Sequence, residues 1–332
     1  MTPRHPFDLR LIVLDADGTL LTSDEQVTAR TRDALAEAQA RGVAIAIATG
    51  RRRSRTIGIL EMLALPGTYL VASQGTAVWH DPLGDAPQMI ADFHLPASSA
   101  RTVLDVVRAH DLALVMLGNA GLPDIVWHDG DLEAHPTMGR YVANNRHGAR
   151  PLDEAEAFVH DPTQFTILAP LNRLRDLRDD LTGRAVARDL MDRHAPRPSV
   201  LGSAARPWHV IFSRGQFTAG AALEVVGPQT NKATGVRALA HHLGIEMAHV
   251  AAFGDNINDA EVLGAVGLGV AMGNATPSAR AGAWAGITRR DGGASTLDRI
   301  APSNDRDGIA WVLEYLREGH LPPGWSPPLS ND

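Results

Sequence analysis

Short apolar segments that alternate with helical patterns constrain the fold of this chain more than any other feature. Three such segments lie near the N-terminus, at residues 11–14 (LIVL), 43–48 (VAIAIA) and 69–72 (YLVA). Their apolar residues are continuous instead of alternating, which is typical of parallel strands that helices cover on both faces. Helical patterns at residues 27–42 and 54–63 lie between them. The order predicts a fold that begins β-α-β-α-β.

The same pattern returns after residue 224, whereas the middle of the chain differs from both ends. Stretches such as DIVWH and WHVIFS alternate apolar and polar residues, as half-exposed strands do. We therefore predict an α/β protein whose doubly wound, mostly parallel sheet is built from residues 1–80 and 223–319. Residues 81–222 are predicted to form an inserted α+β domain. The Pro-rich tail at residues 320–332 is predicted to be disordered.

Composition excludes several classes of function. The chain has no cysteine, so thiolate catalysis, disulfides and iron–sulfur clusters are excluded. A net charge of −7 gives no general affinity for nucleic acid or acidic membranes, and no apolar run approaches the length of a membrane span. We expect a cytoplasmic protein with no nucleic-acid and no membrane partner. The oligomeric state is left open.

Four polar clusters follow the ends of predicted strands, where open α/β sheets bind their ligands. They are residues 15–19 (DADGT), residues 48–51 (ATGR), Lys232 and residues 254–259 (GDNIND). Any one of them is equally well explained as an ordinary turn, because Asp, Gly, Asn and Thr are common turn residues. Their joint occurrence on an alternating scaffold indicates a functional site.

The carboxylates in these clusters suit a hard cation. Asp15 and Asp17 are two positions apart, and their mutual repulsion in a common cavity would require a positive charge. Asp255 and Asp259 supply further oxygen ligands from another strand end. Oxygen donors without His or Cys select Mg²⁺, which binds through a few carboxylates, waters and substrate phosphate. The cofactor predicted here is Mg²⁺.

The remaining polar residues suit a phosphate group. Thr49 and the backbone amides near Gly50 can hold phosphate oxygens. Lys232 is the only lysine among the 31 basic residues, all others being arginine. An ammonium is a compact point charge that can bridge a carboxylate and a phosphate oxygen, which a planar guanidinium does less well. The expected partner is therefore a small phosphorylated metabolite.

These residues resemble the motifs of the haloacid dehalogenase (HAD) superfamily of phosphatases, in its Cof-like branch with a type-IIB cap. LDADGTLL is similar to the first motif of the family, ATGR to the second, NKATGV to the lysine motif and GDNINDAEVL to the fourth. The stretches VAMGNA and NDRDGIAWVLEYL are similar to the usual ending. The resemblance covers about half of the chain, and it implies that the inserted domain is a cap over a Rossmann-like core.

The resemblance also implies catalytic roles. Asp15 would be the nucleophile that forms an aspartyl-phosphate, and Asp17 would be the general acid and then the general base. Mg²⁺ would be held by the Asp15 side chain, the backbone carbonyl of Asp17 and Asp255. Asp259 would support the metal-bound waters or the lysine.

In the same scheme the phosphoryl group would be held by five residues: Thr49, Gly50, Arg51, Lys232 and Asn258. One departure from the family pattern lies nearby. In SQGTAV, Gln74 stands where the family usually shows Asn before Gly. A slightly altered loop facing the cap is therefore expected at this position.

The predicted function is Mg²⁺-dependent hydrolysis of a small phosphomonoester, such as a sugar phosphate. One alternative keeps the chemistry but transfers the phosphoryl group to an acceptor, as a phosphomutase or phosphotransferase does. Another class is a signalling domain with a phosphoacceptor aspartate, which the insertion of about 140 residues disfavours, since such domains are single and compact. The stretch WHDGDLEAH, at residues 127–135, carries two His and two Asp but fits a polar loop better than a second metal site.

Overall fold

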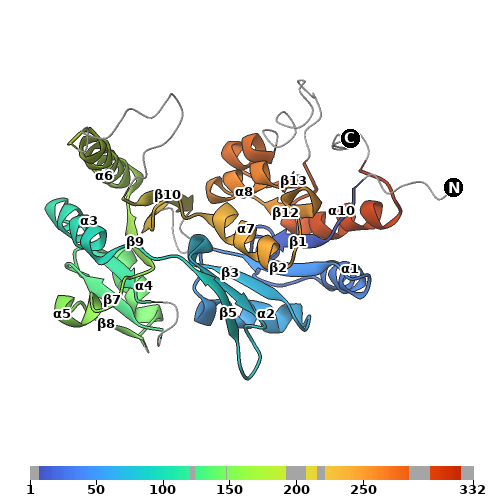
Figure 1. Ribbon diagram of the computed structural model, residues 1–332, viewed down its shortest axis with the longest axis horizontal. Helices are drawn as coiled ribbons and strands as arrows, with labels where there is room; N and C mark the ends of the chain where they lie inside the picture. Colours follow the sequence, from blue (N-terminus) through green and yellow to red (C-terminus); the bar gives the residue numbers. More distant parts are fainter. Residues whose placement is uncertain are drawn as a thin grey trace. The chain divides into compact units, whose positions relative to one another are not determined.

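The computed structural model describes residues 7–119, 124–146, 148–191, 207–214, 221–283 and 300–322 (Figure 1). The chain divides into two compact units. The first joins Met1–Ala91 to Lys232–Asp332, and the second is Asp92–Asn231. The sequence places the corresponding boundaries at residues 81 and 222. The first lies before one further strand of the first unit, and the second lies only two residues into the last strand of the second unit. The sequence also predicts a surface insertion at residues 287–308, before the last helix, and this stretch lies largely outside the described residues, as does most of the Pro-rich tail.

The sheet of the first unit has the strand order β13-β12-β1-β2-β3-β4-β5. Its strands are β1 (Leu11–Leu14), β2 (Ala44–Ala48), β3 (Tyr69–Ala72), β4 (Ala77–His80), β5 (Gln88–Asp92), β12 (Val250–Gly254) and β13 (Leu268–Ala271). The pairs from β13 to β3 are parallel, and β4 runs antiparallel to β3. The predicted α/β class with a mostly parallel sheet is confirmed.

The strand order reverses at β1. From this strand the chain adds β2 and β3 on one side, and it later returns to add β12 and β13 on the other side. The loops after β1 and β12 therefore diverge from neighbouring strands, which is the topological switch point where doubly wound sheets bind ligands. Both loops carry aspartates of the predicted site.

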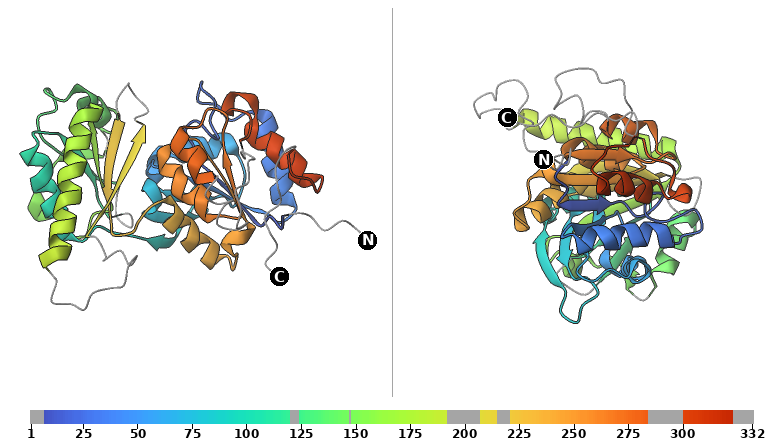
Figure 2. Two further views of the ribbon diagram at one scale, coloured as in Figure 1. Left: turned by 90° about the horizontal axis from the view of Figure 1, so that it is seen from above. Right: turned by 90° about the vertical axis from the view of Figure 1, so that its right-hand side faces the viewer.

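Helices cover both faces of this sheet (Figures 1 and 2). They are α1 (Ala29–Ala40), α2 (Ile57–Leu63), α7 (Lys232–His242), α8 (Ala260–Ala265) and α10 (Gly308–Arg317), with short 3₁₀ turns η1 (Arg53–Arg55), η2 (Ser73–Gly75), η3 (Met247–His249), η4 (Ile257–Asp259) and η5 (Asn304–Arg306). The helix expected at residues 54–63 is divided between η1 and α2. The N-cap Thr28 accepts a hydrogen bond from the Thr31 amide and so fixes the start of α1.

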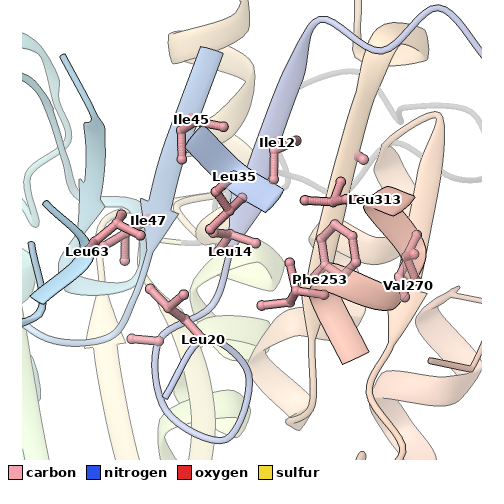
Figure 3. Packing of buried hydrophobic residues seen from close by; sticks show 14 of the residues in the cluster. Ile12, Leu14, Leu20, Leu35, Ile45, Ile47, Leu63, Phe253, Val270 and Leu313 are labelled. Atoms are coloured by element: carbon pink, nitrogen blue, oxygen red, sulfur yellow. The ribbon is translucent and has the colours of Figure 1, made fainter. Parts of the chain in front are cut away.

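Alternate residues of the strands pack on opposite faces. On one face Ile12 and Leu14 of β1 contact the core formed with Leu35 of α1, Phe253 of β12 and Leu313 of α10 (Figure 3). On the other face Leu11 and Val13 belong to the cluster that contains residues of α7 and α8. Each fully buried Leu, Ile or Phe contributes about 1.5–3 kcal/mol by leaving water. This two-sided burial explains why the strands read as continuous apolar runs.

The second unit is built on a mixed sheet with the strand order β10-β11-β9-β6-β7-β8. Its elements are α3 (Ala97–Ala109), β6 (Leu114–Leu117), β7 (Val126–Asp129), α4 (Pro136–Asn144), β8 (Ala149–Pro151), α5 (Glu154–Ala157), β9 (Gln164–Ala169), α6 (Leu171–Met191), β10 (His209–Arg214) and β11 (Ala221–Val226). Its pairs are antiparallel except β7 with β8. α3 and α6 cover one face of the sheet, and α4 packs on β6 and β9.

No helix in the described part of the chain is long and apolar enough to cross a membrane.

Candidate active site

The predicted polar clusters gather at the carboxyl edge of the parallel strands. Asp15 follows β1, Thr49 follows β2 and Asp255 follows β12. In the sheet register Leu14 of β1 pairs with a residue near the end of β2 on one side and of β12 on the other. The Asp15 amide also donates a hydrogen bond to the carbonyl of Phe253, at 3.0 Å. The adjacency of these three strands brings the three loops to one site.

Lys232 begins α7 and lies inside this site. Its ammonium donates hydrogen bonds to Asp15 Oδ1 and to Asp259 Oδ1, the latter at 2.6 Å. The lysine side chain is 1% exposed, as is that of Asp259. The only lysine of the chain is therefore a buried cation that joins the loop after β1 to the loop after β12.

Both carboxylate oxygens of Asp259 accept hydrogen bonds, Oδ1 from the ammonium of Lys232 and Oδ2 from two backbone amides. Oδ2 accepts hydrogen bonds from the backbone amides of Asp255 and Asn256, at 3.1 and 2.9 Å. Gly254 leaves the room for this arrangement, because a Cβ there would lie 2.5 Å from Cβ of Asp259. Asp259 therefore orients Lys232 and shapes the loop that carries Asp255.

Asp255 faces the loop after β1. Its Oδ1 accepts a hydrogen bond from Thr19 Oγ1 at 3.3 Å. Gly18 has a left-handed φ of +82°, and a Cβ on it would lie 2.6 Å from Asp255 Oδ2. Asn274 donates a hydrogen bond to the Gly18 carbonyl at 2.8 Å. The sequence did not single out Thr19 and Asn274 individually, although both lie within motifs that it did identify.

The buried carboxylates repel one another. Burial, followed by repulsion from Asp259, raises the pKa of Asp15 well above its usual range. The same two causes raise the pKa of Asp255 to about 7. Burial by itself lowers the pKa of Lys232, but attraction to Asp15 and Asp259 outweighs it and leaves that pKa raised. Three carboxylates share one ammonium, so the site favours additional positive charge.

The donor set suits a divalent cation. Oxygens of Asp15, Asp255 and Asp259 lie within 4.8 Å of one another. All three groups are hard oxygen donors, which fit Mg²⁺ better than a transition metal. Because Asp259 already binds the lysine and two amides, Asp15 and Asp255 are the side chains best placed to supply ligands.

Asp17 has a different partner. Its carboxylate forms a two-point ion pair with Arg51, at 2.9 Å from Nε to Oδ2 and 2.5 Å from Nη2 to Oδ1. The Arg51 amide in turn donates to Thr49 Oγ1 at 3.1 Å. The sequence predicts Arg51 beside a phosphate but not its pairing with Asp17, which joins the loop after β1 to the loop after β2.

The loop that contains Gly50 is held by the turn η2. The Ser73 amide donates to the Arg51 carbonyl at 2.9 Å, and the Gln74 amide donates to the Thr49 carbonyl at 3.1 Å. The side chain of Gln74 accepts a hydrogen bond from Asn258 Nδ2 at 3.1 Å. Asn258 thus lies next to this turn, and Gln74 has a contact that the sequence did not predict.

The polar stretch at residues 127–135 belongs to the second unit, and its aspartates form hydrogen bonds with other residues of that unit. Asp129 pairs with Arg108 through two hydrogen bonds, at 2.8 and 2.9 Å. Asp131 accepts from the amides of Glu133 and Ala134. Residues 127–129 belong to β7, and residues 130–135 form the loop that follows it. Within the described residues this stretch is not among the clusters that could hold a metal ion.

A doubly wound core that presents buried aspartates and one lysine at its switch point defines the class of a phosphoryl-transfer enzyme. The sequence model of the haloacid dehalogenase-like hydrolases matches residues 12–313, and the chain belongs to this family.

Relatives support the same assignment. The chain is 33% identical over 274 residues to an HMP-PP phosphatase of Cronobacter sakazakii, which covers 81% of this chain and 85% of the relative. It is 24% identical over 329 residues to the phosphatase YwpJ of Bacillus subtilis, covering 93% and 100% of the two chains. The predicted family and the predicted enzyme class, a phosphatase, are confirmed.

Solved structures share the fold. The phosphatase BT1666 from Bacteroides thetaiotaomicron superposes with a TM-score of 0.68 at 21% identity, covering 96% of this chain and 98% of that one. The HAD subclass IIB sugar phosphatase BT4131 gives a TM-score of 0.66 at 18% identity, covering 93% and 99%. The predicted fold, a mostly parallel sheet with a second, mixed sheet, is therefore shared with a structure of HAD subclass IIB.

Proposed function

We propose that the chain hydrolyses a small phosphomonoester through an aspartyl-phosphate on Asp15, with Mg²⁺ as cofactor. The observation that carries this proposal is the position of Lys232, buried between Asp15 and Asp259 at the topological switch point. A buried lysine paired with two carboxylates is expensive to maintain for stability alone. Its compact charge is suited to a site where anionic oxygens approach a carboxylate.

In the first step a carboxylate oxygen of Asp15 attacks phosphorus, and the bond from phosphorus to the leaving oxygen breaks. Asp17 donates its proton to that oxygen, so that the product leaves as an alcohol. In the second step Asp17 takes a proton from water, which attacks phosphorus and releases inorganic phosphate and free Asp15. The ion pair with Arg51 occupies both oxygens of the Asp17 carboxylate, so one of its two hydrogen bonds would open to leave an oxygen that carries the proton, while the other keeps Asp17 oriented.

The Asp15 side chain, the Asp17 carbonyl and Asp255 would hold Mg²⁺. When bound, the ion would neutralise charge that develops on the phosphoryl oxygens. Asp259 would act on the same site indirectly, by holding Lys232 and the amides of the metal-binding loop. We assign Asp259 this indirect role because both of its oxygens already accept hydrogen bonds, and the role replaces the prediction that Asp259 binds the metal directly.

The phosphoryl group would be bound by Lys232, by Thr49 and the amide of Gly50, and by Asn258 beside them. Arg51 would contribute through its position next to Thr49 while it holds Asp17. The similarity to enzymes named HMP-PP phosphatase and sugar phosphatase makes small phosphorylated metabolites the proposed substrates. The second unit would select among them, because the first-unit residues assigned above would act only on the phosphoryl group.

The test is phosphate release from a panel that includes HMP-PP, sugar phosphates and aryl phosphates, with Mg²⁺ present. Asp15→Asn keeps the side-chain volume but removes the nucleophilic charge, and it should abolish turnover. Asp17→Asn should lower kcat by roughly 10²–10⁴-fold for alkyl phosphates. The loss should be smaller for aryl phosphates, whose leaving groups need less protonation. Substantial turnover by Asp15→Asn would exclude the covalent route, and an isomerised product would indicate a mutase.

A further inference from the structure

Three consecutive residues of η2 have left-handed backbone conformations. The φ angles are +48° at Ser73, +58° at Gln74 and +93° at Gly75. Residues other than glycine adopt this region rarely, and usually singly, because Cβ approaches the carbonyl oxygen. Each such residue stores backbone strain and persists only where the surrounding structure enforces it. Contacts with the surrounding structure must therefore hold this turn in its strained conformation.

The backbone of the turn forms hydrogen bonds with the loop of residues 49–51, on both sides of Gly50. The amides of Ser73 and Gln74 donate to the carbonyls of Arg51 and Thr49. From the other side α7 packs closely on the turn, since a Cβ on Gly235 would lie 2.9 Å from the Cα of Gly75. These contacts hold the strained conformation in place.

The side chain of Gln74 leaves this turn and reaches the loop after β12. Gln74 is 1% exposed, and its Oε1 accepts the hydrogen bond from Asn258 Nδ2 at 3.1 Å. One residue therefore binds the Thr49 loop through its backbone and the Asn258 amide through its side chain. The same amide of Asn258 is fixed in orientation by this contact.

We infer that Gln74 is a positioning residue, which fixes the Asn258 amide relative to the loop of Thr49 and Arg51. The inference rests on the proposed function, in which Asn258 lies beside the phosphoryl group. A hydrogen bond in a buried setting restricts the amide to one rotamer, and loss of that restriction lowers the fraction of enzyme that can bind the phosphoryl group correctly. Gln74 acts through Asn258 and does not itself contact the substrate.

The experiment compares Gln74→Met, Asn258→Ala and the double variant, using an aryl phosphate with Mg²⁺. Met has nearly the length of Gln, but its thioether sulfur is a far weaker acceptor than the amide oxygen. Each single variant should lower kcat/KM, by about 3- to 10-fold for Gln74→Met. The double variant should be no worse than Asn258→Ala alone, because nothing remains for Gln74 to position. A purely structural role would instead give additive losses.

A matched control is Gln39→Met, the same substitution at a glutamine whose side chain donates to the Pro66 carbonyl on the surface. Its kinetics should equal those of the unmodified protein. If Gln74→Met does not fold, Gln74→Asn replaces it, since Asn tolerates the left-handed region but is too short to reach Asn258. Additive losses, or normal kcat/KM in the Gln74 variants, would overturn the inference about Gln74 but leave the proposed function intact. Normal kinetics of Asn258→Ala overturn the placement of Asn258 in the proposed function, and the inference with it.

Discussion

An ion-pair cluster in each unit of the chain shows how differently charge can be placed. In the first unit Lys232 and its carboxylate partners are buried together. In the second unit Arg108 binds Asp129 and Glu154 with equally short contacts, but its side chain is 41% exposed. Removing charges from water costs several kcal/mol per ion, whereas exposed pairs change stability by about 0–1 kcal/mol. The buried ion pairs of Lys232 lie where the chemistry is proposed to occur, while the second unit also buries the carboxyl of Glu224.

The sharpest test of this comparison is Lys232→Arg, because arginine occupies every other basic position. The substitution keeps the charge but replaces a compact ammonium by a wider planar group in a site with almost no free room. Displacement of Asp15 or the phosphoryl group by about 1 Å is expected to lower kcat roughly 10²-fold. Steady-state kinetics measure the effect, and thermal unfolding shows whether the fold is retained. Near-normal turnover would show that the site needs only a positive charge at this position.

Much of this contrast is present in the sequence. The continuous apolar runs predict buried parallel strands, and the order of the strands along the chain places Asp15 and Asp255 at one edge. The single lysine in an arginine-rich chain marks Lys232. These features are local in sequence or depend only on strand order, so they can be predicted from the sequence.

Other features depend on contacts between residues far apart in sequence. The ion pair between Asp17 and Arg51 requires the loops after β1 and β2 to face each other at a particular distance. The hydrogen bond from Asn258 to Gln74 depends on a strained turn that no propensity favours. The strand β5 extends the first unit beyond the boundary expected from the sequence. The sequence places that boundary before β5 because the half-exposed residues of this strand resemble those of strands in the second unit.

A second prediction concerns the metal. If the buried carboxylates of the first unit bind Mg²⁺, the ion should stabilise the folded protein by about 2.7 kcal/mol at 100 times its Kd. The midpoint of thermal unfolding should therefore rise by several degrees on addition of Mg²⁺. Asp255→Asn should remove most of this shift. The control Asp129→Asn, in the second unit, should keep it, and an equal loss in both variants would contradict a site at Asp255.

A third prediction concerns the exposed pairs. Arg108→Met keeps much of the apolar stem while removing the contacts to Asp129 and Glu154. Because these groups are solvated, the free energy of unfolding should fall by no more than about 1 kcal/mol, with kinetics unchanged. Urea unfolding measures the change. A loss several times larger would show that the second unit also depends on charge for its stability, which would break the comparison.

The smallest expected effect concerns pH and Asp131 in the second unit. Hydrogen bonds from the amides of Ala134 and Glu133 lower the pKa of this fully solvated carboxyl. A group whose pKa is lower in the folded state contributes stability above its unfolded pKa, near 3.9, and loses it as the pH falls through the folded value. Asp131→Asn keeps an acceptor oxygen but removes the charge.

The variant should therefore unfold at a slightly lower temperature than the unmodified protein at pH 7, and the two should converge as the solution is acidified. Asp105→Asn, at an exposed position of α3, is the matched control for loss of one surface charge. Thermal unfolding at a series of pH values measures both differences. A difference for Asp131→Asn that is constant with pH, or that grows in acid, would assign the effect to the turn geometry instead of the charge. In either case turnover should not change, because the charges of the second unit stabilise its loops, while those around Lys232 are proposed to act on phosphate.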